Sequence, residues 1–114
     1  MQALAVEEVF LNSQYEKADG GKFITDENGE RRLKPGVEGY KIKPLNSLQF
    51  CEVMTDGFQV RNGDNVMNFQ GTKLLLRYGL ENPALINKLD ALTITELAHA
   101  IYAKSALAEA ERKN

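Results

Sequence analysis

The chain has 114 residues, 43% of them hydrophobic and 26% charged, which is the composition of one small globular domain. Its formal net charge is -2, and this charge does not favour nucleic-acid binding, because neutralising phosphates requires clustered Lys and Arg. The one basic run, at residues 31–34, is balanced by neighbouring acids, so we expect no nucleic-acid partner.

The first 45 residues carry the β-type patterns. Residues 3–12 match neither the strand nor the helix period, so a short strand and a helical turn both stay open. Residues 22–25 and 31–34 flank an Asn28-Gly29 pair, which is typical of a hairpin turn whose two central residues have positive φ. Residues 39–43 alternate apolar and basic side chains and predict a half-buried strand that ends at Pro44.

The helical part begins at Asn46. Asn46 and Gln49 have the spacing of a capping box, which predicts a helix that runs to about Thr55 and stops at Gly57. The apolar side chains that we expect to face inward from this helix are Leu48, Cys51 and Met54.

Two more helices are expected before the last one. After a turn at residues 61–63, Asp64 is expected to cap a helix that ends at Gly79. Gly71 inside it costs about 1 kcal/mol relative to alanine, which indicates a close helix crossing or a break. Asn82 and Pro83 suit the cap and first position of a further short helix. The residues expected to face inward are Val66, Met67, Leu74, Leu75, Tyr78, Leu85, Ile86 and Leu89.

The last helix is the clearest element. Thr93 and Glu96 form a capping-box pattern, and Leu92 with Leu97 a hydrophobic staple. A stripe of apolar and small residues predicts the buried face: Ile94, Leu97, Ala98, Ile101, Ser105 and Ala108. The charged residues after this stripe are expected to have nothing to bury. The predicted fold class is therefore α+β, mainly α: about four helices over residues 46–114 and an N-terminal β-hairpin unit over residues 1–45, in one compact domain.

Residues with reactive side chains form no recognisable catalytic or metal-binding motif. His99 is the only histidine, and apart from Glu96 no cysteine or carboxylate lies at metal-ligand spacing from it. Cys51 is expected to be a core residue, and neither Ser47 nor Ser105 lies in a motif that activates a nucleophile. We expect no catalytic, metal or cofactor site and therefore no enzyme.

Four side chains of the β part are candidates for contact with a partner. Phe23, Ile24, Tyr40 and Ile42 form either an exposed surface for self-association or the inner face of the small sheet. The sequence leaves both interpretations open.

The compartment follows from three features. A single cysteine excludes an intramolecular disulfide and fits a reducing environment. The first eight residues lack a basic region and contain Glu7 and Glu8, unlike a signal peptide. No run of eighteen apolar residues occurs, so we expect a soluble cytoplasmic protein with no membrane partner.

The order of these features resembles a protein family. The segments that carry the resemblance are the Asn28-Gly29 hairpin, the run Tyr40-Lys41-Ile42-Lys43-Pro44-Leu45 leading into a helix, Leu74-Leu75-Leu76-Arg77-Tyr78-Gly79-Leu80, and the ending Glu96-Leu97-Ala98 through Glu111-Arg112-Lys113-Asn114. Together they are similar to the tail assembly chaperones of long-tailed bacteriophages, over most of the chain.

This resemblance implies a small, mostly helical, non-enzymatic protein of the host cytoplasm. Such a protein binds the tape-measure protein, keeps it soluble, promotes polymerisation of the tail tube and is absent from the mature tail. The implied partners are copies of itself, the tape-measure protein, a longer frameshifted form of itself and, as a further candidate, the tail-tube protein. The alternative from another class is a small regulatory or immunity-type protein that binds one globular partner.

The resemblance also implies that the protein is made in two lengths, by ribosomes that slip back one nucleotide near the stop codon. Arg112, Lys113 and Asn114 are the candidate junction, since Lys-Asn is encoded by the A-rich codons such a slip needs. The alternative is a frayed helix end.

Overall fold

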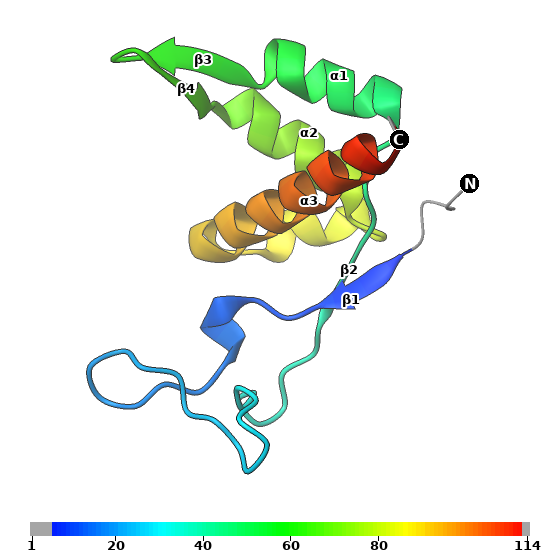
Figure 1. Ribbon diagram of the computed structural model, residues 1–114. Helices are drawn as coiled ribbons and strands as arrows, with labels where there is room; N and C mark the ends of the chain where they lie inside the picture. Colours follow the sequence, from blue (N-terminus) through cyan, green and yellow to red (C-terminus); the bar gives the residue numbers. More distant parts are fainter. Residues whose placement is uncertain (1–5, 113–114) are drawn as a thin grey trace.

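Helices dominate the computed structural model, which describes residues 6–112 (Figure 1). The α-helices are α1 (Ser47–Asp56), α2 (Phe69–Gly79) and α3 (Ala91–Arg112). A 3-10 helix, η2 (Pro83–Lys88), joins α2 to α3, and a single 3-10 turn, η1 (Asn12–Gln14), follows the first strand. The predicted α+β, mainly α class is confirmed.

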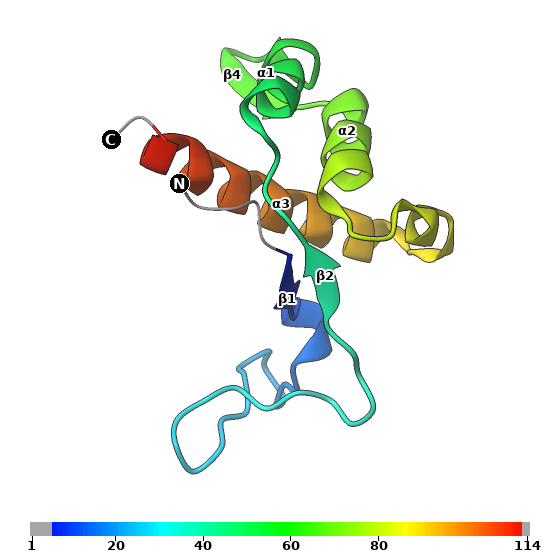
Figure 2. The same ribbon diagram turned by 90° about the vertical axis from the view of Figure 1, so that its right-hand side faces the viewer.

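The strands form two antiparallel pairs. β1 (Glu7–Val9) pairs with β2 (Tyr40–Ile42), and β3 (Phe58–Arg61) pairs with β4 (Asp64–Met67). β2 also bonds on its other edge, because the Glu81 amide donates to the Lys41 carbonyl at 3.1 Å. The chain between β1 and β2, residues 12–39, projects away from the helices as an arm (Figures 1 and 2).

The arm contains the predicted hairpin, with a different turn. Thr25 and Arg31 form an antiparallel bridge, as the sequence predicts. Gly29 has φ 80°, but Asn28 does not have positive φ, so the expected two-residue turn is wrong. The Asp26 carboxylate instead closes a longer loop by accepting from the amides of Asn28 (2.8 Å) and Glu30 (3.0 Å).

A ring of three backbone hydrogen bonds holds the arm together. Glu16 donates to Arg32 at 2.7 Å, Arg32 to Ile24 at 2.9 Å, and Ile24 to Glu16 at 3.0 Å. Because the ring joins three segments of the arm, the arm has a defined backbone although it contributes no residue to the buried core.

The segment after β3 corrects the prediction for the third helix. Asp64 is the first residue of β4 and does not cap a helix, so Val66 and Met67 lie on a strand. The reason is the Asn62-Gly63 turn, whose φ values of 53° and 84° suit a two-residue hairpin. α2 begins five residues after Asp64, where the Asn68 side chain accepts from the Gly71 amide at 2.8 Å.

Gly71 marks a close crossing and not a break. A Cβ at Gly71 would lie 2.4 Å from the carbonyl oxygen of Gly57, the residue that ends α1. Gly79, at the other end of α2, touches Ile101 of α3, since a Cβ there would lie 2.3 Å from Ile101 Cγ2. The two glycines therefore let α2 pack closely against α1 on one side and α3 on the other.

The start of α3 also differs from the prediction. The helix begins at Ala91, and the Asp90 carboxylate accepts from the Thr93 amide at 2.8 Å. Thr93 is thus inside the helix, and Leu92 is 60% exposed, so both the capping box and the staple are wrong. Glu96 instead accepts from the Ser13 hydroxyl at 3.3 Å and ties η1 to α3.

The core lies where α2, α3 and β2 meet. The predicted α3 stripe is confirmed, with Leu97, Ala98, Ile101 and Ser105 buried. Ser105 is satisfied there, because its hydroxyl accepts from the Leu45 amide at 2.9 Å. The other buried apolar residues are Leu11, Ile42, Leu45, Val53, Leu74, Leu75, Leu76 and Leu80.

The overall shape is open. The radius of gyration is 15.7 Å, against about 13 Å for a compact domain of this length. The accessible surface is 7870 Å², against roughly 6,200 Å² for a typical monomer of this mass. The chain thus exposes more surface than a compact monomer does.

Candidate interaction surfaces

The outward face of α1 is an apolar stripe. The Asn46–Gln49 capping box is confirmed, but the prediction that Leu48, Cys51 and Met54 face inward is wrong. Leu48 is 82% exposed, Met54 is 41% exposed, and Cys51 is exposed. These three residues, three positions apart, are called the α1 stripe below. The helix that carries them, α1, is an outermost element in both views (Figures 1 and 2).

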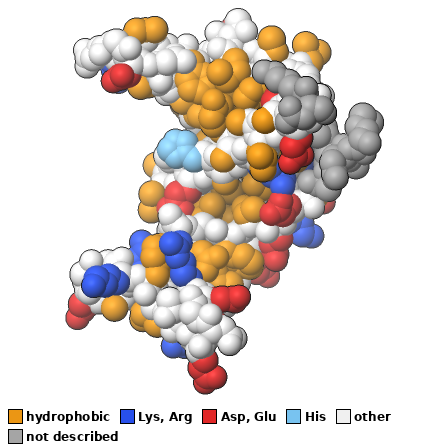
Figure 3. All heavy atoms as spheres, in the orientation of Figure 1, with side chains coloured by type: hydrophobic (Ala, Val, Ile, Leu, Met, Phe, Trp, Pro, Cys, Tyr) orange, Lys and Arg blue, Asp and Glu red, His pale blue; other side chains and the backbone are white. Residues whose placement is uncertain are grey.

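The opposite face of α1 explains this orientation. Val53 is fully buried, and the Phe50 ring stacks on Tyr102 of α3 at 5.8 Å between centroids. Tyr102 also contacts Phe58 of β3 at 5.7 Å. Figure 3 shows apolar surface gathered between α1 and α3. These contacts fix the inward face and leave Leu48 and Cys51 to solvent, whereas Met54, at the edge of the stripe, accepts from the Tyr102 hydroxyl through its sulfur at 3.9 Å.

Both ends of α1 carry charge. At the N-terminal end the Arg112 guanidinium donates to the Leu45 carbonyl (3.1 Å) and the Ser47 hydroxyl (3.2 Å), and pairs with Glu109 at 2.6 Å. At the other end, Asp56 is the last residue of the helix, and no basic residue lies in that turn.

The contacts of Arg112 correct the expectation that the end of the last helix has nothing to pack against. Of the candidate frameshift junction, Arg112 is anchored to α1, whereas Lys113 and Asn114 lie outside the described residues.

More exposed apolar side chains lie on other elements. Val60 of β3 is 75% exposed, and Phe69 at the start of α2 is 76% exposed. On α3, Leu107 is 63% exposed in addition to Leu92. The exposed apolar surface is therefore spread over several faces.

The four predicted contact residues differ in burial and in their place in the fold. Ile42 is 1% exposed and bridges Leu80, so it is a core residue and not available to a partner. Phe23 and Ile24 are half-buried on the arm. The Arg31 guanidinium lies 3.8 Å from the centroid of the Phe23 ring, a cation–π arrangement that covers one face of the ring.

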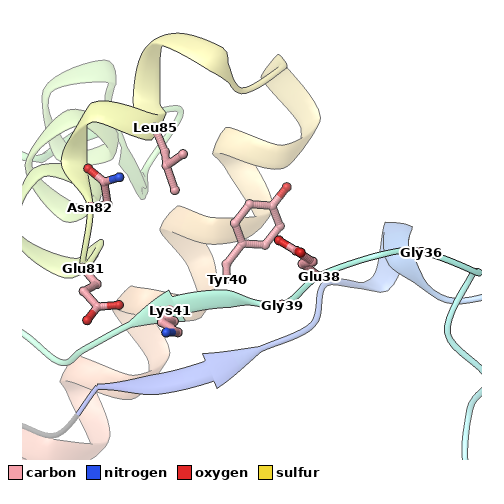
Figure 4. Close-up of a pocket in the computed structure, with 8 residues that line it drawn as sticks. All are labelled: Gly36, Glu38, Gly39, Tyr40, Lys41, Glu81, Asn82 and Leu85. Atoms are coloured by element: carbon pink, nitrogen blue, oxygen red, sulfur yellow. The ribbon is translucent and has the colours of Figure 1, made fainter.

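Tyr40 lies at a shallow depression of about 490 Å³ between β2 and the start of η2. Tyr40 and Leu85 approach it from opposite sides, and Glu38, Lys41 and Glu81 lie around it (Figure 4). The depression is open to solvent, so it suits one side chain of a partner better than an enclosed substrate.

Two groups have shifted pKa values. The pKa of Tyr78 is raised because its hydroxyl donates to the Glu52 carboxylate at 2.5 Å. The pKa of Asp90 is lowered because the side chain and backbone of Thr93 donate to its carboxylate. The largest cause of each shift is one hydrogen-bonding partner, Glu52 of α1 for Tyr78 and Thr93 of α3 for Asp90, so each shift has a structural explanation.

Reactive side chains are dispersed. Within residues 6–112 no three His, Cys, Asp or Glu side chains are grouped as metal ligands would be. His99 is exposed on α3, and the prediction that Cys51 is a core residue is wrong. No helix in the same range is long and apolar enough to cross a membrane.

Comparison of the chain with protein-family models, with curated proteins and with solved structures finds no match. The sequence did not reveal the α1 stripe, because apolar residues at helical spacing predict a buried face. The signal that identifies the buried side is Val53 with Phe50, on the face opposite to Cys51.

Proposed function

We propose that this protein is a phage tail assembly chaperone: a non-enzymatic protein of the host cytoplasm that binds the tape-measure protein and promotes tail-tube polymerisation. Two things support this proposal. One is the resemblance of the sequence to that family. The other is the exposure of apolar side chains on several helices and strands.

The exposed apolar surface is the structural observation that supports a chaperone role. A tape-measure protein is long and helical with at least one apolar face, and it risks aggregation until the tube covers it. A protein that shields it needs one apolar surface for the helix and another for its own copies. The large exposed side chains lie on α1, on β3 and the start of α2, and on α3, so the chain offers more than one such surface.

We propose the β3–α2 corner as the contact for the tape-measure helix. Val60 and Phe69 are the most exposed apolar residues there, and a second shallow depression at this corner is lined by Gln59, Met67 and Phe69 among others. Phe23, Ile24 and Tyr40 remain candidate contacts for further tail components.

Co-expression tests the proposal. The tape-measure protein of the same genome should be largely insoluble alone and should become soluble and co-purify when this chain is present. The double variant Val60→Ser, Phe69→Ser should fold normally, because both residues are exposed. It should keep less of the tape-measure protein soluble than the wild type does. The matched control is Leu92→Ser on α3, which should rescue like the wild type.

An equally insoluble tape-measure protein with and without this chain would contradict the proposal. Recovery of one globular partner instead would favour the regulatory or immunity-type alternative.

A further inference from the structure

We propose that the α1 stripe is the contact between two copies of this chain, with the two α1 helices packed antiparallel about a two-fold axis near Cys51. This inference does not depend on the proposed function, because it concerns the purified protein alone.

The spacing of the stripe makes it self-complementary. Leu48 and Met54 each lie three residues from Cys51, and Cys51 is at the middle of the ten-residue helix. A two-fold rotation therefore places Leu48 of each copy against Met54 of its partner and brings the two Cys51 side chains together. Such an interface is isologous, the commonest kind in homodimers. The described chain leaves Leu48 (82% exposed) and Cys51 uncovered, and Met54 stays 41% exposed although its sulfur accepts from the Tyr102 hydroxyl.

Charge selects the antiparallel arrangement. Asp56 lies at the negative end of the helix dipole, and no acidic residue lies in the first turn to offset the positive end. Arg112 lies at that positive end, its charge shared with Glu109. An antiparallel pair brings the Asp56 end of each helix to the Arg112 end of the other, whereas a parallel pair would bring like ends together. Glu52, on the flank of the stripe, is occupied by Tyr78.

The size of the contact indicates a weak dimer. A stable interface buries about 800 Å² per partner, and a helix of this length offers less. We therefore expect reversible association that becomes visible only at protein concentrations from high micromolar to millimolar.

Sedimentation across that range is the first test. The wild type should shift from monomer to dimer, and Leu48→Asp should weaken association at least about tenfold. Because Leu48 is exposed, and because an acid in the first turn of α1 suits the helix dipole, this variant should melt no lower than the wild type. The control Leu92→Asp makes the same chemical change on an exposed residue of α3 and should dimerise like the wild type. A wild-type monomer throughout, or equal dimerisation of Leu48→Asp, would overturn the proposal.

Asp56→Lys tests the orientation. A cation at this end suits the helix dipole, so the monomer should melt at a higher temperature. The same change places like charges together in an antiparallel dimer, so association should weaken. If dimerisation is unchanged or strengthened, the antiparallel arrangement is wrong.

The native cysteine gives the third test. Diamide takes two electrons and two protons from a pair of thiols, and with Cys51 at the axis it should give a covalent dimer rapidly. Leu48→Asp should slow this reaction, as should urea. The control is Cys51→Ser with Leu92→Cys, which should react only at the collisional rate. Equal rates for the two cysteine positions would overturn the proposal.

Discussion

Substitution of Ser105 by alanine should destabilise the fold out of proportion to the one atom removed. The Ser105 hydroxyl accepts from the Leu45 amide at 2.9 Å, and both residues are fully buried. Without that hydroxyl the amide has no acceptor, and an unsatisfied buried donor costs about 1–3 kcal/mol. This cost is offset by about 0.5 kcal/mol, because alanine has a higher helix propensity than serine. The net loss should be about 0.5–2.5 kcal/mol.

A loss of this size is measurable. For a domain of this length it lowers the melting temperature by about 2–10 °C, and in urea it should lower the midpoint without changing the slope. Ala103→Ser, at an exposed position of the same helix, isolates the difference in helix propensity and should lower stability only by about 0.5 kcal/mol. A Ser105→Ala protein as stable as the wild type would refute the argument that this hydroxyl satisfies the chain entering α1.

Three further substitutions test other parts of the account. Ile101→Asp places an unpaired charge at a fully buried site, costs several kcal/mol and should abolish the far-ultraviolet helix signal; a folded variant would show that this face is not the core. Gly79→Ala forces a Cβ to 2.3 Å from Ile101 Cγ2 and should cost about 1–3 kcal/mol in urea unfolding, and no loss would mean that α2 and α3 can separate freely. Asp90→Ala should lower the melting temperature at neutral pH. Since the folded state lowers the pKa of Asp90, its stabilisation is present above 3.8 and is lost as the pH falls further, so the gap between the variant and the wild type should close in acid. A gap that stays constant with pH would exclude the carboxylate as the cap.

The elements that the sequence predicted correctly are those with local determinants. The Asn46–Gln49 capping box and the Asn82 cap with Pro83 depend on residues within one turn, and the α3 stripe depends on the periodicity of one continuous helix. The close approach at Gly71 was also indicated, because a glycine inside a helix needs a reason.

The errors arose where two local signals competed or where burial depended on distant contacts. The Asn62-Gly63 pair closes a hairpin, so Asp64 begins a strand and does not cap a helix. At the start of α3, Asp90 is the capping residue in place of Thr93. Which side of α1 is buried depends on Tyr102, which is more than forty residues away along the chain, so the periodicity of α1 alone could not reveal the exposed stripe.

The most direct test of the proposed function is the composition of the complex with the tape-measure protein, measured by light scattering after size-exclusion chromatography. We expect several copies of this chain for each tape-measure chain, and fewer when Leu48→Asp removes the contact between copies. A complex with one copy of each protein, or no complex at all, would contradict the proposed function.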